Sequence, residues 1–190
     1  WERLFKYRSL MVVSTFLGTT YENNTKYDTK PGPFEDCGAF ENLVWMKFDP
    51  NNPDMLYIAA GYKSFRVVDF KNEYVGVFTH NLVQPTCIDF TLNGDMVVGD
   101  DQKDKQAPGL YLYTVRQDLC PTIEINSVAV HPTNGRIYFT QYRTGELNYY
   151  DLEKGEKVTE RVLGKSIRYM FWHPTGKYCY YIDNQSHQIY

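Results

Sequence analysis

Carboxylates are the first side chains in this 190-residue sequence that could do chemistry. Asp100, Asp101 and Asp104 share one polar stretch, and Asp183 stands beside Asn184 farther along the chain. Carboxylate and amide oxygens are the ligands that calcium prefers. A calcium loop also needs ligands at alternating positions and a pivotal glycine, whereas lysines interrupt this stretch. We therefore expect a solvated charged loop and no cofactor, with calcium at Asp100 or Asp183 as the weaker alternative.

Tyrosines and hydrogen-bonding side chains recur in the polar segments that separate the apolar runs. Tyrosine rings can stack on the faces of sugars or peptides, and arginine, glutamine and asparagine supply donors. Solvated loop residues and contacts between repeats are the plainer explanation for any one of them. The candidate ligand-binding residues are Tyr62, Lys63, Asp100, Asp101, Gln141, Tyr142, Arg143, Arg168, Tyr169, Asp183, Asn184 and His187.

The histidines form no recognisable catalytic set. His131 and His173 each precede a proline in matching turns, which favours a structural role in the turn. The chain contains no H-E-x-x-H motif, no P-loop and no G-x-S-x-G motif. We therefore assign no catalytic residue and lean against an enzyme.

These residues are carried by a repeat of about 40 residues. Matching turn residues stand at Pro50, Leu92, Pro132 and Pro174. Short alternating apolar runs between the turns are typical of antiparallel strands. A period near 40 with four strands in each repeat predicts an all-β protein, a β-propeller of four-stranded antiparallel blades. A β-sandwich with accidental self-similarity is the alternative.

The repeats organise the whole chain as one propeller domain, residues 1–190. We expect an outer or closing strand at 12–18, a long surface loop at 19–38, and repeats at about 39–80, 81–122, 123–163 and 164–190. Hairpin parity puts the loops between second and third strands on the same face as the entrances to the first strands. We call this the top face, and it gathers the candidate residues. Trp45 and Trp172 share the first-strand pattern and are expected in the core.

Charge and cysteine spacing exclude several classes of function. The net charge is −3 with no basic stripe, so no nucleic-acid partner is expected. No apolar run approaches the roughly 20 residues of a membrane span, and the chain starts at Trp1 as an excised or mature piece would. Cys37, Cys87, Cys120 and Cys179 fit no zinc pattern and are expected to be buried, with a Cys37–Cys120 disulfide as the alternative.

Three segments resemble the NHL class of propeller. Residues 127–138 (SVAVHPTNGRIY) are similar to the first half of the NHL repeat, and residues 181–189 (YIDNQSHQI) to its second half. Residues 13–18 (VSTFLG) followed by Ala39-Phe40 resemble the opening of such propellers, although the Pro-x-Gly of the family is lost in every repeat. The resemblance implies a six-bladed ring of which about four blades are present. A complete four-bladed ring is the alternative.

The same features resemble bacterial proteins in which an NHL propeller follows IPT/TIG immunoglobulin-like domains. That resemblance implies a non-catalytic surface binding or scaffold protein of a glycan-uptake system, often a lipoprotein. The expected partners are a polysaccharide or oligosaccharide and outer-membrane transport proteins, at the outer membrane, the cell surface or the periplasm. The alternatives are a metal-dependent hydrolase or lactonase-like enzyme, with Asp183 and Asn184 among its axial ligands, and a protein–protein interaction module.

Overall fold

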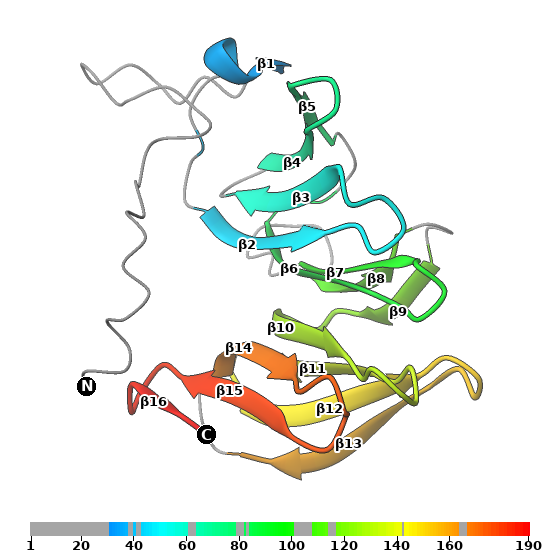
Figure 1. The fold of residues 1–190 in the computed structure, drawn as a ribbon. Coiled ribbons are helices and arrows are strands. Elements are labelled where there is room, and N and C mark those ends of the chain that lie inside the picture. The colour runs from blue at the N-terminus through cyan, green and yellow to red at the C-terminus, as the bar shows by residue number, and fades with distance from the viewer. Residues whose placement is uncertain are drawn as a thin grey trace, which may run out of the picture.

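The chain folds into successive antiparallel β-sheets, each a blade of a β-propeller (Figure 1). The computed structural model describes residues 31–37, 40, 43–60, 64–78, 82, 84–100, 108–113, 117–141, 143–163 and 167–190. The all-β fold predicted from the repeats is therefore confirmed. The strand expected at 12–18 lies outside the described residues.

Each blade is a meander whose first strand lies innermost. Blade 1 comprises β2 (Leu43–Phe48), β3 (Met55–Ala60), β4 (Ser64–Asp69) and β5 (Tyr74–Val77), with β1 (Gly32–Pro33) paired to β5. Blade 2 comprises β6 (Pro85–Phe90), β7 (Met96–Asp100), β8 (Gly109–Leu112) and β9 (Gln117–Pro121). Blade 3 comprises β10 (Ile125–Val130), β11 (Ile137–Gln141), β12 (Glu146–Asp151) and β13 (Glu156–Val162). Blade 4 comprises β14 (Ile167–Trp172), β15 (Cys179–Asp183) and β16 (Gln188–Ile189).

The turn between the first and second strands contains a glycine with positive φ in three blades. Gly94, Gly135 and Gly176 have φ values of 85°, 70° and 71° there. Glycine adopts this left-handed conformation at little cost, so the turn sequences fix where each hairpin closes. At the other end of the same hairpin, every blade has a register irregularity near the start of its first strand.

The hydrophobic core lies between the blades. One cluster joins blades 1 and 2 through Phe65 and Ile88, another joins blades 2 and 3 through Leu110 and Phe139, and a third places Met170 against blade 3. The first strands β2, β6, β10 and β14 are therefore side by side in chain order (Figure 1). Equivalent residues of the four repeats meet along this inner edge.

A short segment covers the outer part of blade 1. Phe34 and Cys37 pack on the cluster that contains Leu56 and Val75. Buried Arg66 donates from Nη1 to the carbonyl of Cys37 at 2.9 Å. The prediction of an irregular loop over 19–38 is thus wrong for residues 32–36, which form β1 and the 3-10 helix η1 (Phe34–Asp36). A two-residue strand is too short to produce an alternating pattern.

The cysteines pack as small hydrophobic residues. Cys37, Cys87 and Cys120 are buried, and Cys87 and Cys120 are free thiols in the cluster between blades 2 and 3. Burial raises the pKa of Cys87 to about 12 and that of Cys120 to about 11. Cys120 lies in the strand β9 rather than in a loop. A Cys37–Cys120 disulfide has no support.

Candidate functional site

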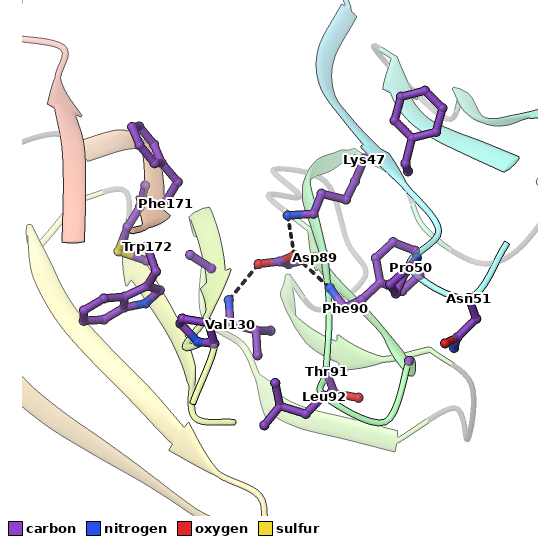
Figure 2. A pocket seen from close by; sticks show the side chains of 15 residues that line it. Lys47, Pro50, Asn51, Asp89, Phe90, Thr91, Leu92, Val130, Phe171 and Trp172 are labelled. Atoms are coloured by element: carbon purple, nitrogen blue, oxygen red, sulfur yellow. Dashed lines mark hydrogen bonds and ion pairs between the residues drawn. The ribbon is translucent and has the colours of Figure 1, made fainter. Parts of the chain in front are cut away.

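A cleft of about 410 Å³ opens at the inner edge of the blades, beside the turns that follow the first strands (Figure 2). Residues from all four first strands line it. The volume is within the range of small-molecule sites, about 300–1,000 Å³. The side chains that give the cleft its chemistry are Lys47, Phe48, Asp89, Phe171 and Trp172.

The repeat explains why these side chains meet. Lys47, Asp89, Ala129 and Phe171 each stand three residues before the matching turn residue of their repeat. The same strand position therefore supplies a cation, an anion, a methyl group and an aromatic ring to one wall. This difference in chemistry at equivalent positions is what distinguishes the cleft from a structural contact repeated in every blade.

Asp89 connects three blades at this wall. Lys47 Nζ lies 2.9 Å from Asp89 Oδ1, and the Val130 backbone N–H donates to Asp89 Oδ2 at 2.7 Å (Figure 2). The carboxylate is only 13% exposed, whereas the Lys47 side chain is 48% exposed. Asp89 is thus committed to the fold, while Lys47 can still reach a ligand.

Aromatic rings flank the ion pair. Phe171 is 52% exposed on β14, and Phe48 is similarly exposed on β2. Trp172 is half-buried between His131 and Tyr138, with ring centroids 4.5 and 4.8 Å away. Within the described residues its Nε1 is buried without a hydrogen-bond partner. The prediction that Trp172 belongs to the core is therefore only partly right, because the ring also lines the cleft.

A second, smaller cavity of about 250 Å³ lies nearer the top face. Tyr169, one of the predicted ligand residues, stacks there on Trp45 with ring centroids 5.5 Å apart and an interplanar angle of 13°. The other lining residues are Leu43, Val44 and Met46. Tyr169 is therefore placed in an apolar setting, and Trp45 packs on the clusters of blade 2 as expected.

The two predicted top-face carboxylates that the structure describes are buried. Asp100 accepts the Gln84 backbone N–H at 2.9 Å. Asp183 accepts the Gln185 N–H at 3.0 Å and the Ser186 hydroxyl at 2.6 Å. Asp183 therefore holds its own turn, whereas Asp100 joins the end of β7 to the segment before β6. Nowhere in the described ranges do three His, Cys, Asp or Glu side chains group so that they could hold a metal ion.

The remaining predicted residues are dispersed. Arg143 Nε donates to Glu124 at 3.0 Å, which links a second-to-third-strand loop to a first-strand entrance on one face, as hairpin parity predicts. Gln141 accepts the Thr144 hydroxyl at 3.1 Å. Arg168, Asn184 and His187 are exposed, and Tyr62, Lys63, Asp101 and Tyr142 lie outside the described residues.

The fold places the chain in a class, the β-propellers, and in this chain a cleft opens at the inner edge of the blades. No model of a known protein family and no curated protein matches the chain. No helix in the described part of the chain is long and apolar enough to span a membrane.

Solved structures resemble the chain closely. It is 44% identical to an auxiliary nutrient binding protein from Bacteroides ovatus, over 93% of this chain and 44% of that one, with a TM-score of 0.81. A second auxiliary nutrient binding protein, from Bacteroides thetaiotaomicron, is 31% identical over 92% of this chain and 46% of that one, with a TM-score of 0.78. A chain of the nidogen/laminin complex, 16% identical over 82% of this chain and 60% of that one, has a TM-score of 0.65 and shows the fold alone. The chain spans less than half the length of the two nutrient-binding structures.

Proposed function

We propose that the protein is a non-catalytic, extracytoplasmic binding protein for a carbohydrate nutrient, and that the cleft is its ligand site. The observation that carries this proposal is half-exposed Lys47 standing beside exposed aromatic rings in an open cleft. The 44% identity to the Bacteroides ovatus auxiliary nutrient binding protein supports a nutrient as the ligand.

Carbohydrates suit this combination of groups. A sugar presents hydroxyl groups at its rim and C–H groups on its faces, so it needs hydrogen-bonding groups and an apolar ring side by side. Lys47 supplies three donors on a flexible stem. Phe48 and Phe171 supply exposed apolar surface, and the cleft of about 410 Å³ is within the range of small-molecule sites.

Within this proposal we keep the NHL class and the cell-surface setting. The motifs at residues 127–138 and 181–189 support the NHL class, and the IPT/TIG resemblance supports a lipoprotein that works with outer-membrane transport proteins. A metal-dependent hydrolase receives no support from Asp183, because both carboxylate oxygens already accept hydrogen bonds from its own loop.

Glycan-array screening followed by calorimetry tests the proposal. Lys47→Ala and Phe171→Ala should each weaken binding of the glycan found by at least about tenfold, since each removes a direct contact of more than about 1.4 kcal/mol. Lys154→Ala is the matched control, because Lys154 lies in the exposed turn between β12 and β13. Lack of binding to any plant or host polysaccharide would overturn the carbohydrate ligand. Binding that is unchanged in Lys47→Ala would move the site away from the cleft.

A further inference from the structure

We infer that Asp89 determines which sugars the cleft accepts, and that it selects uncharged sugars over acidic ones. The inference rests on the proposed function, because it concerns the ligand of the same cleft. Lys47 is the cation that a ligand meets there, and Asp89 is the anion that balances it.

The cleft holds one cation and one anion. Among the described residues that line it, Lys47 and Asp89 are the only two with charged side chains. The Lys47 Nζ and Asp89 Oδ1 atoms lie 2.9 Å apart. The wall of the cleft therefore carries no net charge, although the half-exposed lysine lies at its surface.

Backbone hydrogen bonds fix the Asp89 carboxylate in place. The Phe90 N–H donates to Oδ1 at 2.9 Å, and the Val130 N–H donates to Oδ2 at 2.7 Å (Figure 2). These bonds hold the carboxylate at the wall, whereas Lys47 has a flexible stem and two N–H donors beyond the one that faces Asp89. Lys47 is therefore the group that contacts a ligand, and Asp89 acts on the ligand through its charge.

The apolar lining makes this charge effective. Most of the other lining side chains, among them Ala129, Met170 and Phe171, are apolar. Charges beside apolar walls are screened less than charges in open solvent.

An acidic group bound to Lys47 would be repelled by Asp89. It would lie within the screening length of about 8–10 Å from that carboxylate, so the repulsion would offset much of the attraction to the ammonium. The acidic group would also lose part of its hydration. A sugar hydroxyl has neither cost and can accept a hydrogen bond from Lys47.

The repeat shows that blades stack without a carboxylate at this position. The equivalent residue of blade 3 is Ala129, whose methyl group belongs to the cluster that contains Met170 of blade 4. A carboxylate is thus a property of the junction between blades 2 and 3, where it faces Lys47 and the cleft. This difference between equivalent positions is what a role in specificity requires.

Calorimetry with matched pairs of glycans tests the inference. The neutral probes are the glycan found on the array, laminarin and galactomannan, and each is compared with a form whose primary hydroxyls are oxidised to carboxylates. The parent protein should bind the neutral form at least about tenfold more tightly than the acidic form. Asp89→Asn, which keeps an acceptor for the Val130 N–H, should shift this ratio toward the acidic form by at least about tenfold.

Two further measurements separate a charge effect from a structural one. Raising NaCl from about 50 to about 500 mM should weaken the acidic complex of Asp89→Asn and change the neutral complex of the parent protein little. Glu153→Gln is the matched control, because it also removes one negative charge but lies in the exposed turn between β12 and β13, and it should leave the ratio unchanged. If Asp89→Asn does not fold, Lys47→Gln tests the same balance, since the uncompensated Asp89 should strengthen the preference for the neutral form.

Three outcomes would overturn the inference. If the parent protein binds acidic forms as tightly as neutral ones, or binds only acidic glycans on the array, the proposed function stands and the selection by Asp89 is refuted. If Asp89→Asn weakens both forms alike, Asp89 has a structural role only. If no glycan binds at all, the proposed function fails and the inference fails with it.

Discussion

Removing the Asp89 carboxylate should destabilise the protein far more than removing its lysine partner. In Asp89→Ala the buried N–H of Val130 loses its 2.7 Å acceptor. An unsatisfied buried donor costs about 1–3 kcal/mol. The Lys47 ammonium contributes less than about 1 kcal/mol, because a pair with one half-exposed partner is screened by solvent. We expect a loss of about 2 kcal/mol for Asp89→Ala and less than about 1 kcal/mol for Lys47→Met.

Urea unfolding followed by tryptophan fluorescence measures both changes. At about 2–4 °C per kcal/mol for a chain of this size, Asp89→Ala should also lower Tm by about 4–8 °C. Asp89→Asn keeps an oxygen that can accept the Val130 N–H, so its loss of unfolding free energy should lie between those of Asp89→Ala and Lys47→Met. If Lys47→Met lowers the free energy of unfolding as much as Asp89→Ala does, then the Lys47–Asp89 ion pair holds the blades together, and not the hydrogen bond from the Val130 N–H to Asp89. That result would refute the prediction.

Three further changes test the packing between blades. Gly99→Ala should lower the free energy of unfolding by about 1–3 kcal/mol through overpacking, because the added Cβ would lie 2.5 Å from the Cys87 sulfur. Gly76→Ala, whose added Cβ would have its nearest contact at 3.1 Å, should lower it less. Equal urea midpoints for the two variants would contradict this prediction. His131→Ala should lower the free energy of unfolding by about 1–2 kcal/mol. His131→Asn should restore the stability that comes from the hydrogen bonds within the turn, but not the stability that comes from the hydrogen bond to Gly176 of blade 4. Thermal melts of the two variants measure both effects. The pKa of Cys87 is raised from 9.0 to about 12 in the folded protein. Its thiol therefore stabilises the fold fully below pH 9 and progressively less as the pH rises toward 12. The difference in unfolding free energy between the parent protein and Cys87→Ala should change between about pH 7 and about pH 10, and a constant difference would disprove this prediction.

The blade architecture was predictable because its signals are local. Pro132 and Pro174 repeat with glycine two or three residues later, and each hairpin closes there. The position of β9, the fourth strand of its repeat, was not predicted, since QDLCP shows no alternation of apolar and polar residues. Tertiary pairing with β8, rather than intrinsic pattern, makes it a strand.

The cleft was not predictable in the same way. Lys47 and Asp89 are 42 positions apart and meet only because two blades lie side by side. The repeat showed that Lys47 and Asp89 occupy equivalent strand positions. It did not show how far one first strand is shifted relative to the next, and that shift decides which side chains touch. The hydrogen bonding of Asp183 within its turn was more predictable, because aspartate side chains in turns commonly accept a hydrogen bond from the backbone N–H two residues later, as Asp183 does from Gln185.

The segment that covers blade 1 makes the two ends of the row of blades unlike. Arg66, Cys37 and Phe40 occupy one end, where the guanidinium lies 4.9 Å from the Phe40 ring. Head-to-tail joining of identical chains would need that end to be open, and such non-closing contacts generate filaments. Phe34, Cys37 and Phe40 occupy the face of blade 1 that an identical chain would need for such a contact, so the described cover disfavours head-to-tail joining.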